Sequence, residues 1–505
     1  MARVVMLVAN NWETDSRVIR EATAVSQSGH EVHVICHKDA SAYTEVTHNG
    51  VTYHCLPTPK PLSQLADLPK MFRLHLQVLS AGLSDPNYRL KAGGKIVTLA
   101  LRIICCFPLG IVLVAVGLLA RWLVIKPLRA AARAIKSAIL YFGFDYLRVQ
   151  HSYRKAMQPI WYLLNLAKLA AQHLRLFAMQ LLDVDSIRYL NQFGVRAQPL
   201  ARELRPALVH AHDLVTVSGG LAISKSLGAK LIYDAHELET HTNYWGLQAR
   251  TKRWIEFYER VLTRRCTAVV TVCESIADWL RDNYDIARPI VVHNSPDIEK
   301  TAESAGPHET LRARIGLQKS VPLAVYVGSV TIDRGLALCV RALASAPELH
   351  FAFVGPRYIE TEKEILRTAA ELGVGNRVHL VDAVPSAQVT PFISDADCSV
   401  IAIQNVCLSY YFCFPNKLLE SVLADIPVVA ARLIELENFV HRYHTGVIAD
   451  ETDPKAIALA IQTVIANRKD FLPTAEARKE IVAEYGWSNQ KRKLLVLYSD
   501  ILLAA

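Results

Sequence analysis

Short apolar runs alternate with an amphipathic segment at the start of the chain. The apolar runs are RVVMLVA at residues 3–9, HEVHVIC at 30–36 and VTYHCL at 51–56. Between the first two, Val18, Ala22 and Val25 recur at helical spacing, and the segment ends at Gly29. Apolar runs of this length are typical of buried strands, and the wider spacing is typical of a helix. The pattern therefore predicts a strand, a helix and two further strands.

This pattern stops near Pro57 and resumes near Leu208. Four more apolar runs then alternate with helical stretches, and they read ALVHAHD, AKLIYDAHE, AVVTVCE and PIVVHNSPD. Residues 299–320 are polar and irregular, which favours a linker. Alternation of strands and helices predicts a doubly wound parallel sheet for this first half of the protein.

A second alternating series follows residue 320. Its apolar runs are PLAVYVGSV, LHFAFVG, RVHLVDAV, CSVIAI, IPVVAA and TGVIAD, and the chain ends in the helical stretch GWSNQKRKLLVLYSDILL. We therefore predict an α/β protein with two Rossmann-like halves and a large helical insertion in the first. The expected parts are residues 1–57 with 201–300, the insertion at 58–200, the second half at 301–474, and a C-terminal helix within 475–505.

The insertion contains an 18-residue stretch without a charge, IICCFPLGIVLVAVGLLA at residues 103–120. Its length permits a membrane span. However, the strands before residue 57 and after residue 208 should share one sheet, and a lone crossing would place them on opposite sides of the bilayer. The stretch must then dip into the membrane and return, lie at its surface, pair with a second span, or form a buried hairpin.

Charge is distributed unevenly along the chain. The net charge is +9, but residues 60–200 alone carry 19 Lys and Arg against 5 Asp. Lys126, Arg129, Arg133 and Lys136 share one face of a predicted helix whose other face is apolar. Such a helix suits anionic lipid headgroups. We therefore expect the insertion to bind an anionic membrane through these four residues and through three that flank the apolar stretch, Arg102, Arg121 and Trp122.

The same pattern in the insertion is compatible with two further structures. It could be a helical subdomain packed on itself, with solvated basic faces, or an oligomer contact. Nucleic acid is a weaker partner, because aromatic residues are not interleaved with the charges as single-strand binding favours. The ten cysteines lack disulfide or zinc spacing, and the first residues lack the shape of a signal peptide, so reduced thiols are expected. The expected location is the cytoplasmic face of the cell membrane, with monotopic or peripheral attachment.

In the first half, polar residues stand where strands should end. The segment after the first strand holds Asn11, Asp15 and Arg17, without the glycine fingerprint of dinucleotide-binding proteins. Asp15 could simply cap the helix that follows, while Arg17 could reach a cleft. We assign all three to the acceptor side of a cleft between the halves.

Two later strands in this half end in a histidine followed by an acid. These are His212-Asp213 in HAHD and His236-Glu237 in DAHE. One such histidine is usually structural, but two at neighbouring strand ends favour a cleft wall. A metal site needs three convergent ligands, and the third is not evident.

In the second half, candidate anion-binding residues follow two strands. Gly328 and Ser329 begin a loop in which Arg334 precedes a helix, and Pro415-Asn416-Lys417 begin a second helix that carries Glu420 one turn later. A guanidinium and helix N–H groups can bind a diphosphate, and a carboxylate can accept both hydroxyls of a ribose. A nucleoside diphosphate therefore fits, and Gly355, Val384 and Phe414 are expected to line the same site.

As a set, these segments resemble the family 4 retaining glycosyltransferases of the GT-B fold. The resemblance is carried by DSRVIREATAVSQSGHEVHVI, LVHAHDL, LIYDAHEL, YVGSVTIDRGL and FPNKLLESVLADIPVV. It implies transfer of a sugar from a nucleotide donor with retained configuration, usually without a metal or other cofactor. It further implies that Glu420 grips the donor ribose, that Arg334 binds the diphosphate, and that His212 lies near donor sugar and acceptor. The last helix should cross back to the first domain.

Two positions depart from the family pattern. The family often has an acid eight residues before the ribose-binding one, where this chain has Phe412, and a second base after the loop glycine, where it has Ser329. Backbone N–H groups from Phe414 to Lys417 could replace the sugar contacts of the missing acid.

The expected function is transfer of a sugar, with UDP as the first choice of nucleotide, to a lipid-linked or cell-surface glycan. His212, Arg334 and Lys417 are the expected catalytic residues. Two alternatives are a membrane scaffold that has lost activity and a nucleotide-sugar 2-epimerase.

Overall fold

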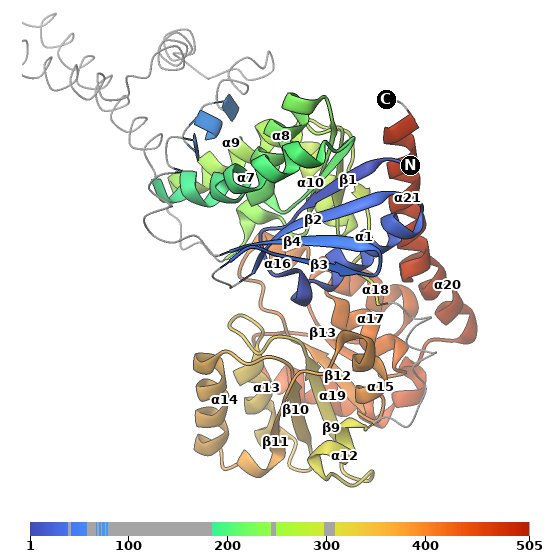
Figure 1. The fold of residues 1–505 in the computed structure, drawn as a ribbon. Coiled ribbons are helices and arrows are strands. Elements are labelled where there is room, and N and C mark those ends of the chain that lie inside the picture. Colours follow the sequence, from blue (N-terminus) through green and yellow to red (C-terminus); the bar gives the residue numbers. More distant parts are fainter. Residues whose placement is uncertain are drawn as a thin grey trace, which may run out of the picture. The chain divides into compact units, whose positions relative to one another are not determined.

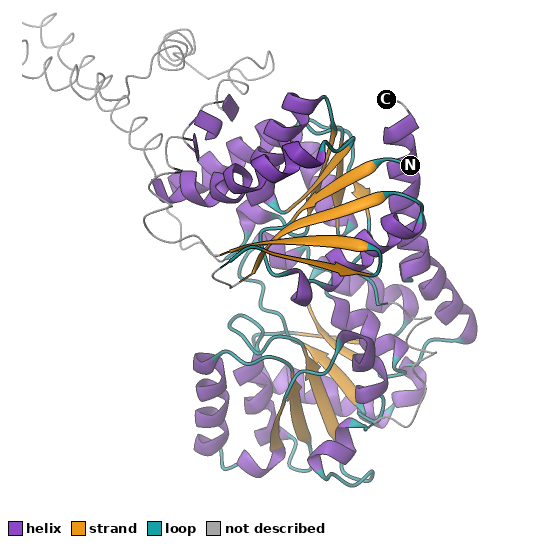
Figure 2. Cartoon of the chain, in the orientation of Figure 1, coloured by secondary structure: helices purple, strands orange, loops and turns teal. Residues whose placement is uncertain are grey.

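The computed structural model describes residues 1–38, 42–57, 184–243, 249–296 and 309–503, together with residues 67, 70–71, 73–75 and 77–78. The chain forms two compact units, residues 1–65 with 193–505 and residues 66–192. The first unit contains two β-sheets with helices packed around them (Figures 1 and 2).

The first sheet has the strand order β3-β4-β2-β1-β5-β6-β7-β8. Its strands are β1 Arg3–Leu7, β2 Glu31–Lys38, β3 Thr44–His48, β4 Val51–Pro57, β5 Leu208–His212, β6 Lys230–Ala235, β7 Ala268–Thr271 and β8 Ile290–Val291. All pairs are parallel except β3 with β4. The strand β3 was not predicted, because all five of its residues are exposed and show no apolar periodicity.

The pairing of β1 with β5 brings together the two sides of the predicted insertion. Val4 pairs with Leu208 and Leu7 with Ala211, both in parallel register. The prediction that strands before residue 57 and after residue 208 share a sheet is therefore confirmed. The helices of this half are α1 Ser16–Gln27, α7 Val184–Leu204, α8 Leu214–Leu227, α9 Ala249–Thr263 and α10 Glu274–Tyr284. Helix α7 runs through residue 200, where the insertion was expected to end.

The second sheet is entirely parallel in the order β11-β10-β9-β12-β13-β14. Its strands are β9 Leu323–Val327, β10 His350–Val354, β11 Val378–Val381, β12 Cys398–Ile401, β13 Val428–Ala431 and β14 Gly446–Ala449. Its helices are α12 Leu311–Ile315, α13 Leu336–Ala342, α14 Ile359–Glu371, α15 Val389–Ile393, α16 Leu408–Tyr411, α17 Asn416–Leu423, α18 Ile434–Tyr443 and α19 Pro454–Ala466. All six predicted strands are confirmed.

The C-terminal helices are α20 Ala475–Tyr485 and α21 Trp487–Leu503. Leu494, Leu497 and Ile501 of α21 are buried in the same apolar cluster as Val4 and Met6 of β1. The last helix therefore packs on the first sheet, as the resemblance implied. Burial of these side chains removes apolar surface from water, at about 25 cal/mol per Å², which ties the end of the chain to its beginning.

One predicted boundary is wrong. Residues 311–315, expected within a polar linker, form α12. Leu311 is fully buried, and Arg312 donates through Nη2 to Asp397 at 2.6 Å and through Nε to the carbonyl of Asp395 at 2.7 Å. The buried guanidinium anchors this short helix, so a polar sequence conceals a structured segment.

Among the residues that the structure describes, no helix is both long and apolar enough to cross a membrane. Residues 103–120 lie outside the described residues, as do the residues expected to bind lipid, namely Arg102, Arg121, Trp122, Lys126, Arg129, Arg133 and Lys136. Membrane association therefore stays a prediction. The cysteines that the structure describes are free thiols.

Candidate functional site

Two segments meet at the carboxyl edge of the second sheet. The first follows β9 and runs through Gly328 to α13. The second follows β12 and runs through α16 to α17, which begins at Asn416 after its N-cap Pro415. Because β9 and β12 pair in parallel, both segments leave the sheet at the same edge. This topology explains why motifs almost ninety residues apart come together.

Lys417 lies against the glycine loop. A Cβ atom added to Gly328 would stand only 3.0 Å from Lys417 Nζ, so glycine leaves the space for the ammonium group. Gly328 also has a φ of 120°, which side-chain-bearing residues rarely adopt. Lys417 Nζ lies 3.9 Å from the centroid of the Tyr326 ring. The ammonium group therefore stands between the loop backbone and an aromatic face.

The surroundings of Lys417 stabilise its charged form only weakly. Burial and, to a smaller extent, nearby Arg334 lower its pKa, Glu420 opposes both effects, and the resulting pKa is about 7. A bound anion would favour the charged form. The site therefore gains most from a ligand that brings negative charge.

Arg334 is the second cation at this edge. Its guanidinium carbon lies 4.7 Å from the centroid of the Tyr410 ring. The residues on either side, Asp333 and Gly335, have left-handed φ values of 59° and 67°, and α13 begins directly afterwards. Two cations close enough to influence each other's charge are typical of a phosphate-binding site.

Glu420 lies one turn after Lys417 in α17. Burial raises its pKa, Lys417 and Arg20 of α1 oppose this shift, and the resulting pKa is about 7. At neutral pH its carboxylate is thus partly protonated before a ligand binds. Lys417 is thus close enough to both Arg334 and Glu420 for their charges to affect its pKa, as expected for residues of one site. Their contacts with a donor remain a prediction.

Other residues predicted to contact the donor make contacts within the protein that shape the loop or pack the core. A Cβ atom at Gly355 would lie 2.2 Å from the carbonyl oxygen of Gly328, so Gly355 permits the turn of the loop. Val384 packs against the apolar cluster below the sheet. The Phe414 ring is stacked 5.2 Å from that of Tyr485. Ser329 contributes its carbonyl to a hydrogen bond with the Tyr326 hydroxyl at 2.8 Å.

At the carboxyl edge of the first sheet, Arg17 is enclosed by acids. It is only 4% exposed, and Nε and Nη2 donate to Asp234 at 3.0 and 2.9 Å. Nε also lies 3.0 Å from Glu21 Oε1, and Nη1 donates to the carbonyl of Val292 at 2.7 Å. Burial would raise the pKa of Asp234, but Arg17 and His236 hold it well below its usual range. Arg17, predicted to reach the cleft, is a buried partner of Asp234.

The two predicted histidines are in contact with each other. His212 Nδ1 lies 3.1 Å from His236 Nε2, and His236 lies 3.2 Å from Asp213 and 3.3 Å from Asp234. Burial would lower the pKa of His236, but Asp213 and Asp234 raise it to about 10. His236 is therefore an imidazolium. His212 is fully buried, whereas the side chain of His236 is 18% exposed, so His236 stands nearer the surface.

Asn11 and Asp15 serve as local caps. The Asn11 side chain accepts from the N–H of Glu13 at 3.2 Å, and Asp15 accepts from the N–H of Val18 at 3.1 Å. Capping by Asp15 was the simpler of the two alternatives considered for it, and the structure confirms it.

Four side chains of the kinds that bind metals converge beside Arg17. Atoms of Glu21, His210, His212 and Asp234 lie within 4.8 Å of one another. Arg17 already forms ion pairs with both carboxylates, and a metal ion would be repelled by this guanidinium. We therefore interpret the group as an ion-pair cluster. Sequence reasoning missed Glu21, whose only signal is its position four residues after Arg17 on a buried helix face.

Segments of the first half contact the two anion-site segments. The Leu238 N–H donates to Ser409 of α16 at 3.3 Å, and Asn243 donates to Asp333 at 2.8 Å. Glu237, next to Leu238, has its pKa raised by burial and by Asp213, while Arg334 opposes this shift. Its Oε2 atom is buried without a hydrogen-bond partner among the described residues. Glu237 thus offers an acceptor close to Arg334.

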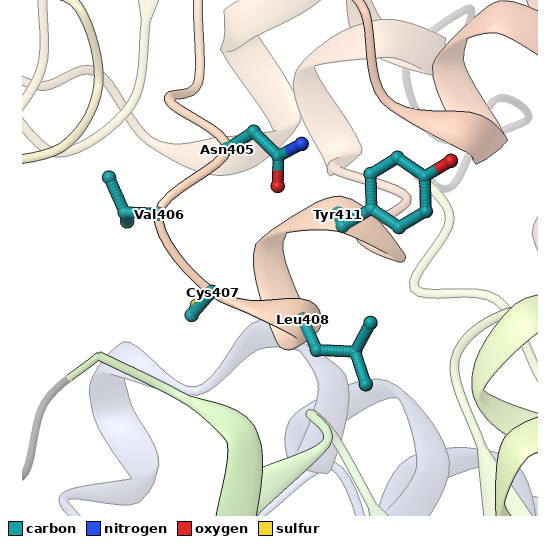
Figure 3. Close-up of a pocket in the computed structure, with 5 residues that line it drawn as sticks. All are labelled: Asn405, Val406, Cys407, Leu408 and Tyr411. Atoms are coloured by element: carbon teal, nitrogen blue, oxygen red, sulfur yellow. The ribbon is translucent and has the colours of Figure 1, made fainter.

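A pocket of about 350 Å³ lies on the segment that joins β12 to α17. Its lining residues are Asn405, Val406, Cys407, Leu408 and Tyr411 (Figure 3). The amide of Asn405 and the hydroxyl of Tyr411 are its polar groups. Tyr411, which lines this pocket, directly precedes Phe412 in the chain. The carbonyl of Phe412 accepts a hydrogen bond from the thiol of Cys273, in the first half, at 3.0 Å.

Comparison with protein families identifies two matching domains. Residues 166–300 match the model described as Glycosyltransferase Family 4, and residues 307–483 match the model described as Glycosyl transferases group 1. Together the two models match more than half of the chain.

Individual relatives are distant. The chain is 26% identical to a D-inositol 3-phosphate glycosyltransferase of Corynebacterium urealyticum over 48% of its own length and 58% of that protein. It is 23% identical to a GDP-mannose:cellobiosyl-diphosphopolyprenol alpha-mannosyltransferase of Xanthomonas oryzae over 63% and 81% of the two chains. The structure of sucrose-phosphate synthase from Thermosynechococcus elongatus superposes over both full chains with a TM-score of 0.61 and 14% identity, which shows a shared fold.

Proposed function

This chain belongs to family 4 of the glycosyltransferases, and from that premise we propose that it transfers a sugar from a nucleoside diphosphate to a lipid-linked or cell-surface glycan at the cytoplasmic face of a membrane. One observation carries the donor assignment. Lys417 occupies the space left by Gly328, and Arg334 is close enough to perturb its charge. Two cations beside a glycine backbone suit a diphosphate, with Glu420 accepting from the ribose.

The proposed reaction proceeds on one face of the donor sugar. The bond from the anomeric carbon to the leaving phosphate oxygen breaks while the acceptor oxygen bonds to the same carbon. The acceptor proton passes to the departing phosphate oxygen. Arg334 and Lys417 stabilise the charge that develops on the diphosphate, so no nucleophile of the protein is required. His236, Asp213 and Glu237 supply the polar groups proposed for the acceptor side.

The membrane part of the proposal comes from the sequence. An uncharged 18-residue stretch and a basic amphipathic helix lie in the insertion. A diphosphopolyprenol acceptor appears in the name of the Xanthomonas relative, which supports a lipid-linked acceptor. Flotation of the full chain with vesicles of anionic phospholipid tests this: binding that persists at high salt supports it, and a chain that stays soluble at high salt without detergent contradicts it.

The donor assignment is tested with Arg334→Ala and Glu420→Ala. We expect both variants to lose at least tenfold in affinity for UDP or GDP by calorimetry and to lose transfer from the matching sugar nucleotide. Lys363→Ala, at an exposed position of α14, serves as the control. Wild-type affinity and activity in both variants would refute the site. Absence of any thermal shift with nucleotides would favour the scaffold alternative, and turnover without acceptor to a changed sugar would favour the epimerase.

A further inference from the structure

Tyr326, at the end of β9, contacts both parts of the proposed diphosphate site. Its ring centroid lies 3.9 Å from Lys417 Nζ. Its hydroxyl donates to the carbonyl of Ser329 at 2.8 Å. A Cβ atom at Gly328 would lie 3.0 Å from Lys417 Nζ and 3.7 Å from the Tyr326 hydroxyl oxygen, so glycine allows both groups to approach. One side chain, only 1% exposed, thus joins the lysine to the loop.

The ring and the hydroxyl have different physical effects. An aromatic face attracts a cation without neutralising it, whereas a carboxylate at the same place would form an ion pair and compete with phosphate for the ammonium. The hydroxyl, being buried, needs an acceptor. By donating to the Ser329 carbonyl, it directs that oxygen towards Tyr326. A carbonyl oxygen directed at the phosphates instead would repel them.

The charged and titratable groups around Lys417 determine how stable its charged form is. Arg334 from the glycine loop disfavours its charge, while Glu420 and Cys413 favour it. Burial is the largest influence and lowers the pKa of Lys417 to about 7. Near neutral pH the amine is thus close to losing its proton, and any contact that favours the cation changes the charged fraction directly.

We propose that Tyr326 is a positioning residue of the donor site, whose ring keeps Lys417 as an unpaired cation and whose hydroxyl fixes the glycine loop. The inference rests on the proposed function, since the ligand is the diphosphate of the donor. Tyr326 itself need not touch the donor, because it acts through Lys417 and Ser329.

Two variants separate the roles of ring and hydroxyl. Tyr326→Phe keeps the ring and removes the hydrogen bond, and we expect about threefold to tenfold weaker binding of UDP or GDP with an unchanged pH dependence. Tyr326→Leu removes the ring, and we expect a further loss of about tenfold, with the alkaline loss of binding shifted down by up to about one pH unit. Isothermal titration calorimetry between pH 6 and 9 measures both effects.

A second measurement needs no ligand. The rate at which acetic anhydride modifies Lys417 at pH 6, followed by peptide mass spectrometry, reports its neutral fraction, which is about a tenth at that pH for a pKa of about 7. We expect this rate to rise several-fold in Tyr326→Leu and to stay at the wild-type value in Tyr326→Phe. If the leucine variant unfolds in a thermal scan, Tyr326→Met takes its place.

Tyr443 offers a matched control. Arg442 lies over its ring at 4.9 Å, and its hydroxyl donates to Glu484 at 3.0 Å, so it has the same kind of contacts in α18. Tyr443→Phe should leave nucleotide affinity and Lys417 reactivity unchanged. Wild-type affinity, pH dependence and reactivity in folded Tyr326→Leu would overturn the inference alone. A wild-type protein that binds no nucleoside diphosphate would instead refute the proposed function, and the reactivity of Lys417 would still decide the effect of the ring.

Discussion

Arg17 and Lys417 are cations at the carboxyl edges of the two sheets, and they are partnered in opposite ways. Arg17 is enclosed by Asp234, Glu21 and the carbonyl of Val292. Lys417 lies over the Tyr326 ring and makes no ion pair within the described residues. A cation that is fully satisfied inside the protein holds the fold, whereas a cation left over an aromatic ring retains its charge for a ligand.

The same contrast extends to neighbouring groups. In the first sheet, His236 is held as an imidazolium between Asp213 and Asp234, so its charge is paired within the protein. In the second, Lys417 and Glu420 each have a pKa near 7, moved towards neutrality by burial. The cations at the first edge are therefore paired with acids of the protein, whereas Lys417 at the second edge is left to pair with the charge of a ligand.

The largest effect on stability should come from removing one member of the ion pairs at the first edge. Asp234→Ala leaves Arg17 buried without its bidentate partner, and loss of one member of a buried pair costs about 3–5 kcal/mol. We expect a drop of that size in the free energy of unfolding, measured by urea titration and circular dichroism. Glu360→Ala, which breaks the exposed pair with Lys363, should change little. A loss below about 1 kcal/mol for Asp234→Ala would contradict the structural role given to Arg17.

At the second edge, we expect a substitution to weaken ligand binding without lowering the stability of the fold. Lys417→Met preserves length without the charge, and we expect nucleotide affinity to fall by about a hundredfold or more, since charge-assisted contacts to the diphosphate are lost. Stability should not fall. The pKa of Lys417 is about 7 in the folded protein against an ordinary value of 10.5, so the folded state binds fewer protons between these values. Wild-type stability is then lost as pH falls from 10.5 to 7, and Lys417→Met should remove this loss.

Chemical denaturation at pH 7 and pH 9 measures this difference. The advantage of Lys417→Met over the wild type should be larger at pH 7. A variant that is less stable than the wild type at both pH values, yet still binds nucleotide, would show that Lys417 is a structural cation like Arg17.

The pH dependence of the second edge should be bell-shaped. Glu420, with a pKa of about 7, loses its carboxylate on the acid side, and Lys417 loses its charge on the alkaline side. We expect kcat/KM, or UDP affinity, to be greatest near pH 7 and to fall by about tenfold per pH unit on either limb. Lys417→Arg should remove the alkaline limb and Glu420→Gln the acid limb. A flat profile between pH 6 and 8.5 would refute the coupling of the two residues.

The smallest effect concerns the contact between the halves. Asn243→Ala removes the hydrogen bond to Asp333 on the glycine loop, at an exposed position. We expect KM for the donor to rise about twofold to threefold with kcat unchanged, because an exposed hydrogen bond contributes about 0.5–1 kcal/mol. Asn283→Ala, which removes an exposed bond within α10, is the control and should leave KM unchanged. A loss of kcat would contradict this expectation and show that the contact also shapes the site during transfer.

The sequence alone predicted most of the fold for a simple physical reason. Buried parallel strands are continuous apolar runs, and each such run in both halves became a strand at its expected place. The exceptions were β3, which is exposed along its whole length, and α12, whose polar residues conceal a buried arginine. Strand β3 is defined by its pairing with the neighbouring β4 across the turn at Asn49 and Gly50, and not by apolar periodicity. Helix α12 depends on Asp395 and Asp397, which are far away in the chain and which local periodicity cannot show.

The candidate site divides in the same way. By itself the sequence determined which residues could bind a nucleotide, because Gly328, Arg334, Lys417 and Glu420 lie in the segments that follow two strands, β9 and β12, which topology places together. Only the tertiary structure decided which charged residues are already paired. Arg17 and Lys417 both follow strands of a Rossmann-like half, yet buried acids enclose the first while a tyrosine ring supports the second. Packing across the sheet sets that difference, because it determines which side chains lose water and which partners replace it.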